Sequence, residues 1–189
     1  MSDMLAKADL SVVGFDISLK MVALTQGRIK GQFSVSDMLS YDIEGKGKFA
    51  GVLTIFAHLQ LSYADFHSAV YKFARVLKPG GILALGQMPS DFYVKDGFSY
   101  DVAKAYVEDY DIPFMREPPP TFKMSAEGQR KFLASMELEI VWENIDRVQP
   151  RNERCGLEEQ QYIIARRADD KTLAPPKPFR KLSQRGSSP

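Results

Sequence analysis

Hydrophobic and polar positions in the first forty residues follow two periods in turn, one typical of strands and one typical of helices. The stretch "LSVVGFD" at 10–16 is apolar and β-branched, and it predicts a strand that ends in an acid. "SLKMVALTQGR" follows with helical spacing, with Ser18 as the expected N-cap and Gly27 as the expected end. "GQFSVSDML" at 31–39 alternates again and predicts a second strand, whereas 2–9 predicts the last turns of a helix.

The middle of the chain repeats the alternation of strand and helix. "FAGVLTIFAHLQL" at 49–61 is almost continuously apolar, which is typical of a central parallel strand buried on both faces. A helix is expected over 64–77, with one apolar face. "KPGG" at 78–81 then predicts a turn, and "ILALGQM" at 82–88 predicts another strand. This order favours an α/β fold with a mostly parallel sheet.

The last third of the chain changes character. Residues 89–123 are rich in aromatic residues and proline, with one helix expected near Tyr100–Val107. A helix capped by Ser125 should follow, and "ELEIVWENIDRVQ" and "EEQQYIIARR" predict an antiparallel hairpin. The composition of 168–189 predicts a disordered tail.

Composition narrows the functional classes. The net charge of +1 provides no strong field for nucleic acid or a membrane surface, so neither is expected as a partner. One cysteine, Cys155, and two histidines, His58 and His67, do not make a disulfide framework or a zinc site, and no metal is expected. No signal peptide or spanning segment is predicted, so we expect a cytoplasmic protein.

At this point the order of elements resembles the class I S-adenosylmethionine (SAM) dependent methyltransferases, particularly the small-molecule enzymes of biosynthetic pathways. The matching pieces are "VVGFDIS", "FSVSDML", "KFAGVLTIFAHLQL" and, most specifically, "FARVLKPGGILAL". The resemblance covers roughly residues 3–167 and implies a Rossmann-like methyltransferase sheet with a C-terminal antiparallel hairpin. Residues 89–123 then stand where that family inserts a substrate lid.

The resemblance also implies roles for individual residues. Asp16, at the end of its strand, would accept hydrogen bonds from the cofactor ribose, and Ile17 would flank the adenine. Asp37 would take the adenine amino group, with Met38 packed on the ring. His58 would lie at the substrate edge, where an imidazole could act as a general base. Asp16 could equally cap the next helix, and His58 could be a structural histidine.

The sequence departs from the family pattern ahead of Asp16. Family members have a glycine-rich turn there, which lets the backbone approach the cofactor, and this sequence contains no such turn. We therefore expect a domain over 1–167 that lacks the family's first strand, which lies between the second and fourth strands of the family's sheet. The gap could close by direct pairing, be filled by another chain, or reflect truncation of a longer protein.

Three hypotheses for function follow. The first is a methyltransferase-like protein that has lost SAM binding and serves secondary metabolism as an accessory or metabolite-binding protein, with a small aromatic metabolite as ligand. The second is an active SAM-dependent methyltransferase on a small aromatic acceptor, completed by a partner chain or a missing N-terminus. The third is a regulatory subunit that pairs with a protein partner, or with its own copy, through the exposed sheet gap.

Overall fold

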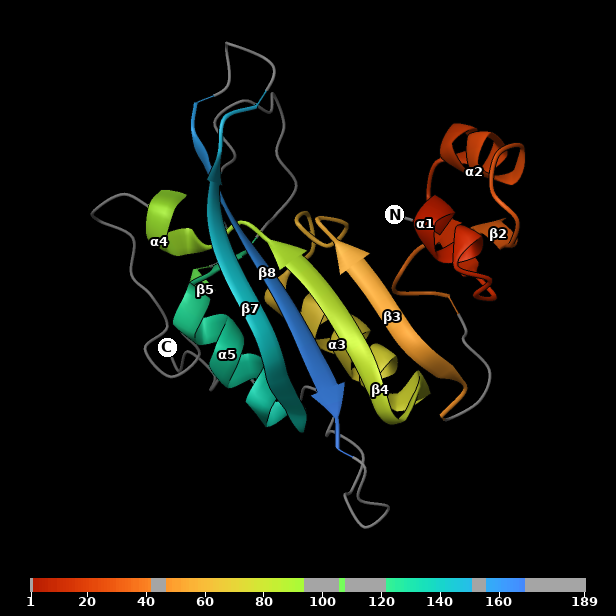
Figure 1. Cartoon of the computed structure of the whole chain (residues 1–189). Helices are drawn as coiled ribbons and strands as arrows, with labels where there is room; N and C mark the ends of the chain where they lie inside the picture. Colours follow the sequence, from red (N-terminus) through yellow and green to blue (C-terminus); the bar gives the residue numbers. More distant parts are fainter. Residues whose placement is uncertain (1, 42–46, 94–105, 108–121, 151–155, 169–189) are drawn as a thin grey trace, which may run out of the picture. The chain divides into compact units, whose positions relative to one another are not determined.

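The computed structural model describes residues 2–41, 47–93, 106–107, 122–150 and 156–168 (Figure 1). The chain divides into two compact units, Met1–Ile43 and Glu44–Pro189. The first contains α1 (Ser2–Lys7), β1 (Val13–Asp16), α2 (Leu19–Gln26) and β2 (Gln32–Val35). The second contains β3 (Phe49–Ile55), α3 (Tyr63–Val76), β4 (Leu77–Gln87), α4 (Ser90–Tyr93), β5 (Tyr106–Val107), β6 (Lys123–Met124), α5 (Ala126–Ser135), β7 (Leu138–Val148) and β8 (Glu158–Arg167).

The first unit is one strand–helix–strand motif preceded by a short helix. β1 and β2 pair in parallel, with Asp16 opposite Val35. The predicted cap of α2 is confirmed, because the Ser18 hydroxyl accepts a hydrogen bond from the Met21 amide at 3.4 Å and Gly27 ends the helix. β1 is shorter than the pattern predicted, beginning at Val13.

Few apolar side chains are buried in this unit. Val22 is its one buried apolar residue among those the structure describes. Gly14 lies so close to Phe33 on β2 that a Cβ added there would meet the ring at 2.9 Å. This glycine therefore serves a close side-chain approach inside a strand, not a cofactor turn.

The second unit is built on a four-stranded sheet with the order β3-β4-β8-β7. β3 and β4 run in parallel, whereas β8 is antiparallel to both β4 and β7. The predicted C-terminal hairpin is therefore confirmed, and the sheet is mixed. The prediction that the 49–61 run is a central strand was wrong, because among the described strands β3 pairs with β4 alone and its Leu53 is 39% exposed.

The "KPGG" motif forms a tight irregularity within β4, because Phe49 pairs with Leu77 and Gly51 pairs with Ile82, whereas residues 78–81 lie outside that pairing. Residues 78–81 belong to β4, and the pairing with β3 shifts register between Phe49 and Gly51. Gly80 has a φ of 72°, a value that suits glycine. The motif therefore bends one end of β4 where the chain leaves α3.

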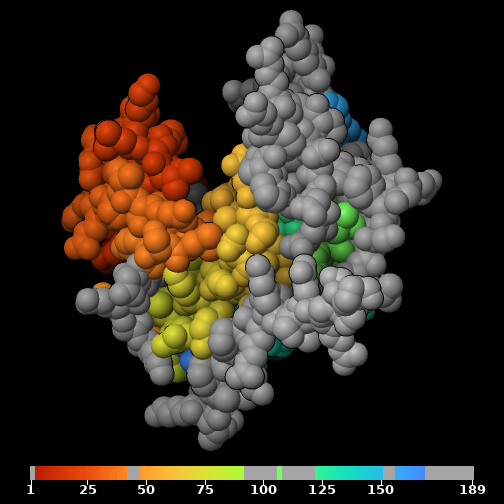
Figure 2. Space-filling model, turned by 180° about the vertical axis from the view of Figure 1, so that it is seen from behind, coloured from red at the N-terminus to blue at the C-terminus, as the bar shows by residue number. Residues whose placement is uncertain are grey.

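Helices α3 and α5 cover one face of this sheet, and none of the described helices of this unit lies on the other face (Figure 1). The apolar face predicted for α3 is confirmed, and its residues, with Leu77 after it, are buried: Phe66, Val70, Phe73, Ala74 and Leu77. Seen from the opposite side, the outer surface of α3 reaches solvent (Figure 2). The core of the unit thus lies between the sheet and these two helices.

A small antiparallel pair, β5 and β6, packs beside this core. Tyr106 of β5 stacks on Tyr63 of α3 with ring centroids 4.0 Å apart, and Phe122 contacts Phe66 at 5.1 Å. The helix expected near Tyr100–Val107 does not extend to its last two residues, which form β5. Residues 94–105, 108–121 and the predicted tail from 169 lie outside the described residues.

Candidate functional site

Two carboxylates stand at one edge of the β1–β2 sheet. Asp16 is the last residue of β1, and Asp37 comes two residues after the end of β2. The Ser36 amide donates to the Asp16 carbonyl at 3.0 Å, which holds the two strand ends together. Because the strands are parallel, their carboxyl ends meet there, which is where open α/β sheets bind ligands.

Each carboxylate is oriented by the backbone that follows it. Asp16 Oδ1 accepts from the Ser18 amide at 2.8 Å, and Asp37 Oδ1 accepts from the Leu39 amide at 2.7 Å. Both side chains are exposed. Asp16 therefore supports the start of α2, as the alternative interpretation of this residue as a helix cap predicted. The second oxygen of its carboxylate can accept a hydrogen bond from a hydroxyl donor.

Apolar side chains flank both acids. Ile17 is 74% exposed directly after Asp16, and Met38 is half-buried directly after Asp37. Exposed apolar side chains are common in this unit, where Met4 is 72% and Leu19 71% exposed, so exposure alone does not mark a ring-binding surface. The cofactor roles predicted for these four residues stay predictions.

Tyr41 is a residue that the sequence pattern did not single out. Its ring stacks on Phe15 of β1 at 4.3 Å, and its amide donates to the Asp37 carbonyl at 2.8 Å. These contacts fix the Asp37–Tyr41 turn against β1. Only the pairing of the two strands reveals this role, because Phe15 and Tyr41 are distant in sequence.

His58, the predicted general base, lies in the second unit, three residues after β3. Its side chain is 3% exposed, packs against Phe66 at 4.6 Å, and has Nδ1 3.4 Å from the Thr54 hydroxyl. Burial, together with the nearby charge of Lys123, lowers the pKa of His58 to about 3. An imidazole with so low a pKa is a weak base, so these features favour the structural interpretation.

Lys123 on β6 is a second buried titratable residue in this unit. Unlike His58, it was not indicated by the sequence. It is 6% exposed, and burial lowers its pKa, with Glu158 acting in the opposite direction. Buried lysines of this kind are rare outside paired or functional positions.

A chain of hydrogen-bonded polar side chains crosses the core face of the four-stranded sheet. Gln87 of β4 donates to Gln161 of β8 at 2.5 Å, and Gln161 donates to Glu143 of β7 at 2.6 Å. Arg130 of α5 closes the chain with two bonds to the Glu143 carboxylate, at 2.9 and 3.0 Å. Sheet and helix are thus joined by a continuous hydrogen-bonded path.

Neither a metal centre nor a spanning helix is found in the part of the chain that the structure describes. No cluster of three or more metal-ligating side chains occurs there. No described helix has the length and hydropathy needed to cross a bilayer.

Comparison with known proteins identifies the fold. A family model described as a methyltransferase domain matches residues 1–81. The structure is similar to that of a SAM-dependent methyltransferase from Methanosarcina mazei, with a TM-score of 0.67, 18% identity, and coverage of 88% of this chain and 86% of that one. The chain has the fold of the SAM-dependent methyltransferases.

Two further solved structures extend this likeness to proteins with bound cofactor. One is 1,6-didemethyltoxoflavin-N1-methyltransferase from Burkholderia thailandensis with S-adenosylhomocysteine (SAH), with a TM-score of 0.61, 16% identity, and coverage of 86% of this chain and 64% of that one. The other is magnesium protoporphyrin IX methyltransferase from Synechocystis PCC 6803 with SAM, with a TM-score of 0.58, 16% identity, and coverage of 88% and 64%. This chain therefore spans about two thirds of the length of each. No curated protein sequence matches it.

Proposed function

We propose that this chain is a SAM-dependent methyltransferase that binds the adenosine half of its cofactor at the edge formed by Asp16 and Asp37. The observation that carries the proposal is the placement of two exposed, oriented carboxylates at the carboxyl ends of adjacent parallel strands. The methyltransferase-domain match covers this edge.

The chemistry of the four residues suits an adenosine. The Asp16 carboxylate can accept from both hydroxyls of a ribose, since a vicinal diol matches two acceptor oxygens. Asp37 can accept from the exocyclic amino group of the adenine. Ile17 and Met38 offer apolar surface to the two faces of the base.

Methyl transfer makes small demands on the protein once both substrates are bound. SAM supplies an electrophilic methyl group, and the acceptor displaces it in line. The protein contributes position and exclusion of water more than acid–base groups. The weak basicity of His58 is therefore compatible with the proposal, and a small aromatic acceptor is the class we propose.

Calorimetric titration with SAH tests the proposal. We expect Asp16→Asn to weaken SAH binding at least about tenfold, because one charge-assisted hydrogen bond contributes about 1.5–3 kcal/mol. Asp9→Asn is the matched control, because Asp9 is also exposed, belongs to the same unit, and has a φ of 59° that asparagine tolerates. Equal SAH binding by the two variants would contradict the assignment of Asp16.

A second candidate is an accessory protein of a biosynthetic pathway that no longer binds the cofactor. The same titration separates the two candidates. If the chain is folded by circular dichroism and neither SAM nor SAH produces heat, the accessory role becomes the better proposal.

A third candidate is a subunit that pairs with another chain through its strand edges. Among the described strands, β1 pairs only with β2 and β3 pairs only with β4. β3 also contains no charged residue and no proline, the features that protect edge strands from pairing. Sedimentation at micromolar concentration tests this candidate, and a monomer at that concentration would contradict it.

A further inference from the structure

Two polar side chains of the second unit are buried without hydrogen bonds. Ser90, at the start of α4, and Gln129, in the second turn of α5, are each 0% exposed. The Ser90 hydroxyl and both polar atoms of the Gln129 amide have no hydrogen-bond partner among the described residues. Buried polar groups are almost always bonded, because desolvation without a partner destabilises the fold.

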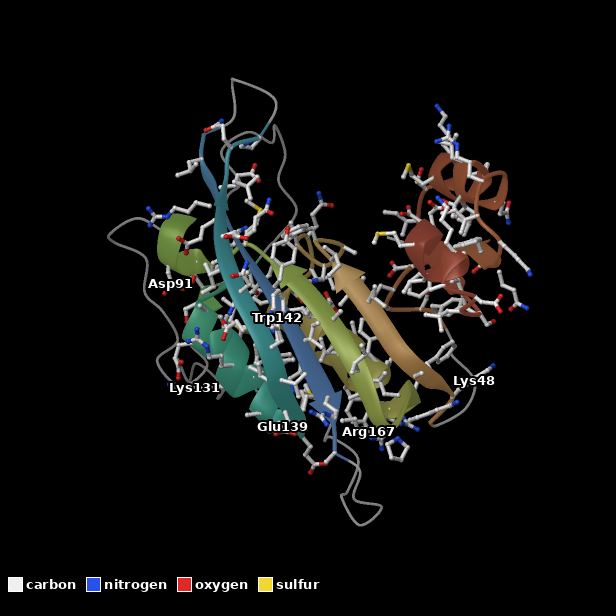
Figure 3. All side chains as sticks on the ribbon, in the orientation of Figure 1. Lys48, Asp91, Lys131, Glu139, Trp142 and Arg167 are labelled. Atoms are coloured by element: carbon white, nitrogen blue, oxygen red, sulfur yellow. The ribbon has the colours of Figure 1, made fainter. Side chains whose placement is uncertain are left out.

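Both side chains lie beside the beginning of α5. Ser90 follows the carboxyl end of β4 by three residues, and its neighbour Asp91 on α4 is labelled in Figure 3. The Asp91 carboxylate accepts a hydrogen bond from the Ala126 amide at 2.7 Å. Gln129 comes three residues after Ala126, so it occupies the same side of the helix one turn later. The Asp91–Ala126 bond therefore places the segment that contains Ser90 beside the first turn of α5, the turn that precedes Gln129.

The packing one turn beyond Gln129 on α5 is aromatic. Phe132, one turn further along the buried face of α5, stacks on Phe66 at 5.0 Å and meets Tyr63 edge-on at 6.2 Å. Phe66 and Tyr63 belong to α3, the helix that follows β3. A molecule held by Gln129 would thus lie against aromatic side chains, where a flat ring is favoured.

The charges nearby disfavour an anion. The amide of Ala126, at the positive end of α5, is already bonded to the Asp91 carboxylate. Arg130, the next residue after Gln129, is engaged by Glu143 at 2.9 Å and by Glu127 at 3.0 Å. A group that donates and accepts without charge matches an amide and a hydroxyl best.

We propose that Ser90 and Gln129 form the polar end of a binding site for a neutral aromatic molecule that carries both a hydrogen-bond donor and an acceptor. The site does not require the cofactor, and this proposal is independent of the function proposed above. Its position at the carboxyl end of β4 agrees with the edge where α/β sheets bind ligands.

Three probes that share a phenyl ring test the chemistry by thermal shift on the full chain. Benzamide donates and accepts, benzoate carries a charge and only accepts, and toluene does neither. We expect millimolar benzamide to raise the Tm and the other two probes to raise it by less than half as much. An equal shift from all three, or no shift from benzamide, overturns the proposal.

Matched variants separate a ligand site from a pair of groups that merely tolerate burial. Gln129→Met keeps the size and removes the polar atoms, so we expect a Tm raised by a few degrees and the benzamide shift lost. Ser90→Ala should reduce the shift. Gln87→Met is the control, because Gln87 is equally buried but bonded to Gln161, so this change should lower the Tm and keep the shift.

Retention of the full benzamide shift in Gln129→Met overturns the proposal and assigns the amide to a buried water. The SAH titration tests the role of Asp16, which lies in the other unit. Failure of the cofactor proposal and failure of this one are therefore distinguished by different ligands and different variants.

Discussion

Arg167, near the end of β8, donates to the carbonyl of Leu77 at 2.7 Å. The same nitrogen, Nη1, also lies 3.0 Å from the Ala74 carbonyl and 3.3 Å from that of Arg75. These carbonyls belong to the last turn of α3 and the residue after it, which have no partners within the helix. A cation at this end also complements the helix dipole. One side chain thus ties the last strand to the end of the main helix.

Replacing Arg167 should destabilise the second unit. We expect Arg167→Met to lower the free energy of unfolding by about 1.5–3 kcal/mol, because it removes charged hydrogen bonds to buried carbonyls. Urea denaturation measures the change. Arg166→Met is the control, since Arg166 is exposed on the same strand, and an equal loss in both variants would show that the carbonyl contacts contribute nothing.

His58 should make stability depend on pH. In the unfolded chain its pKa is about 6.5, whereas burial lowers the folded pKa to about 3. The unfolded state therefore binds the proton first, so the stability from the neutral buried ring is complete above pH 6.5 and is lost as the pH falls toward 3.

Between pH 7 and pH 5 this loss should be about 2 kcal/mol in the free energy of unfolding. His58→Gln should remove it, and His67→Gln should keep it. Denaturation curves of the three proteins at both pH values provide the comparison. A pH dependence unchanged in His58→Gln would show that the ring is already protonated or exposed.

The Arg130–Glu143 pair should couple α5 to β7. Desolvation raises the pKa of Glu143, but hydrogen bonds from Arg130 and Gln161 outweigh it and hold that pKa below the ordinary value. For a carboxyl group this stabilisation is present above the unfolded pKa of about 4.5 and is lost as the pH falls through the folded pKa.

A double-mutant cycle with Arg130→Met and Glu143→Gln should give a coupling free energy of about 1 kcal/mol at pH 7, since the pair is only partly buried. The coupling should fall toward zero at acidic pH. The Lys131–Glu127 pair, 3.8 Å apart and exposed, is the control and should show almost none. Equal coupling in both pairs would contradict the role of the bidentate bond.

Gly14 should tolerate no side chain. A Cβ at this position would meet the Phe33 ring at 2.9 Å, so Gly14→Ala must displace that ring from its place against β1. We expect weaker SAH binding together with lost circular dichroism from the first unit. The control Gly27→Ala has its nearest added contact at 3.6 Å and should leave both measurements unchanged.

Sequence patterns predicted the helices and strands more accurately than the positions of the strands in the sheet. The face of α3 and the caps Ser18 and Ser125 follow from local rules, and the structure confirms all three. The position of β3 did not follow, because an apolar run has the same composition in a central strand and in an edge strand.

The candidate site was only half visible in the sequence. Asp16 and Asp37 were predicted because the resemblance to the methyltransferase family implies roles for acids at these strand ends, and those roles stay predictions. Lys123, Gln129 and Tyr41 were not found, because their roles depend on contacts between distant segments. Burial of a lysine or a glutamine has no signature in periodicity.

The uneven distribution of buried apolar residues bears on the proposed binding of SAM and SAH. With Val22 as the one buried apolar residue described in the first unit, little free energy holds the β1–β2 motif in its folded form without a ligand. Adenosine binding would then be coupled to folding of that motif. The affinity would be reduced by the ordering cost, and would vary steeply with temperature through a large negative heat-capacity change.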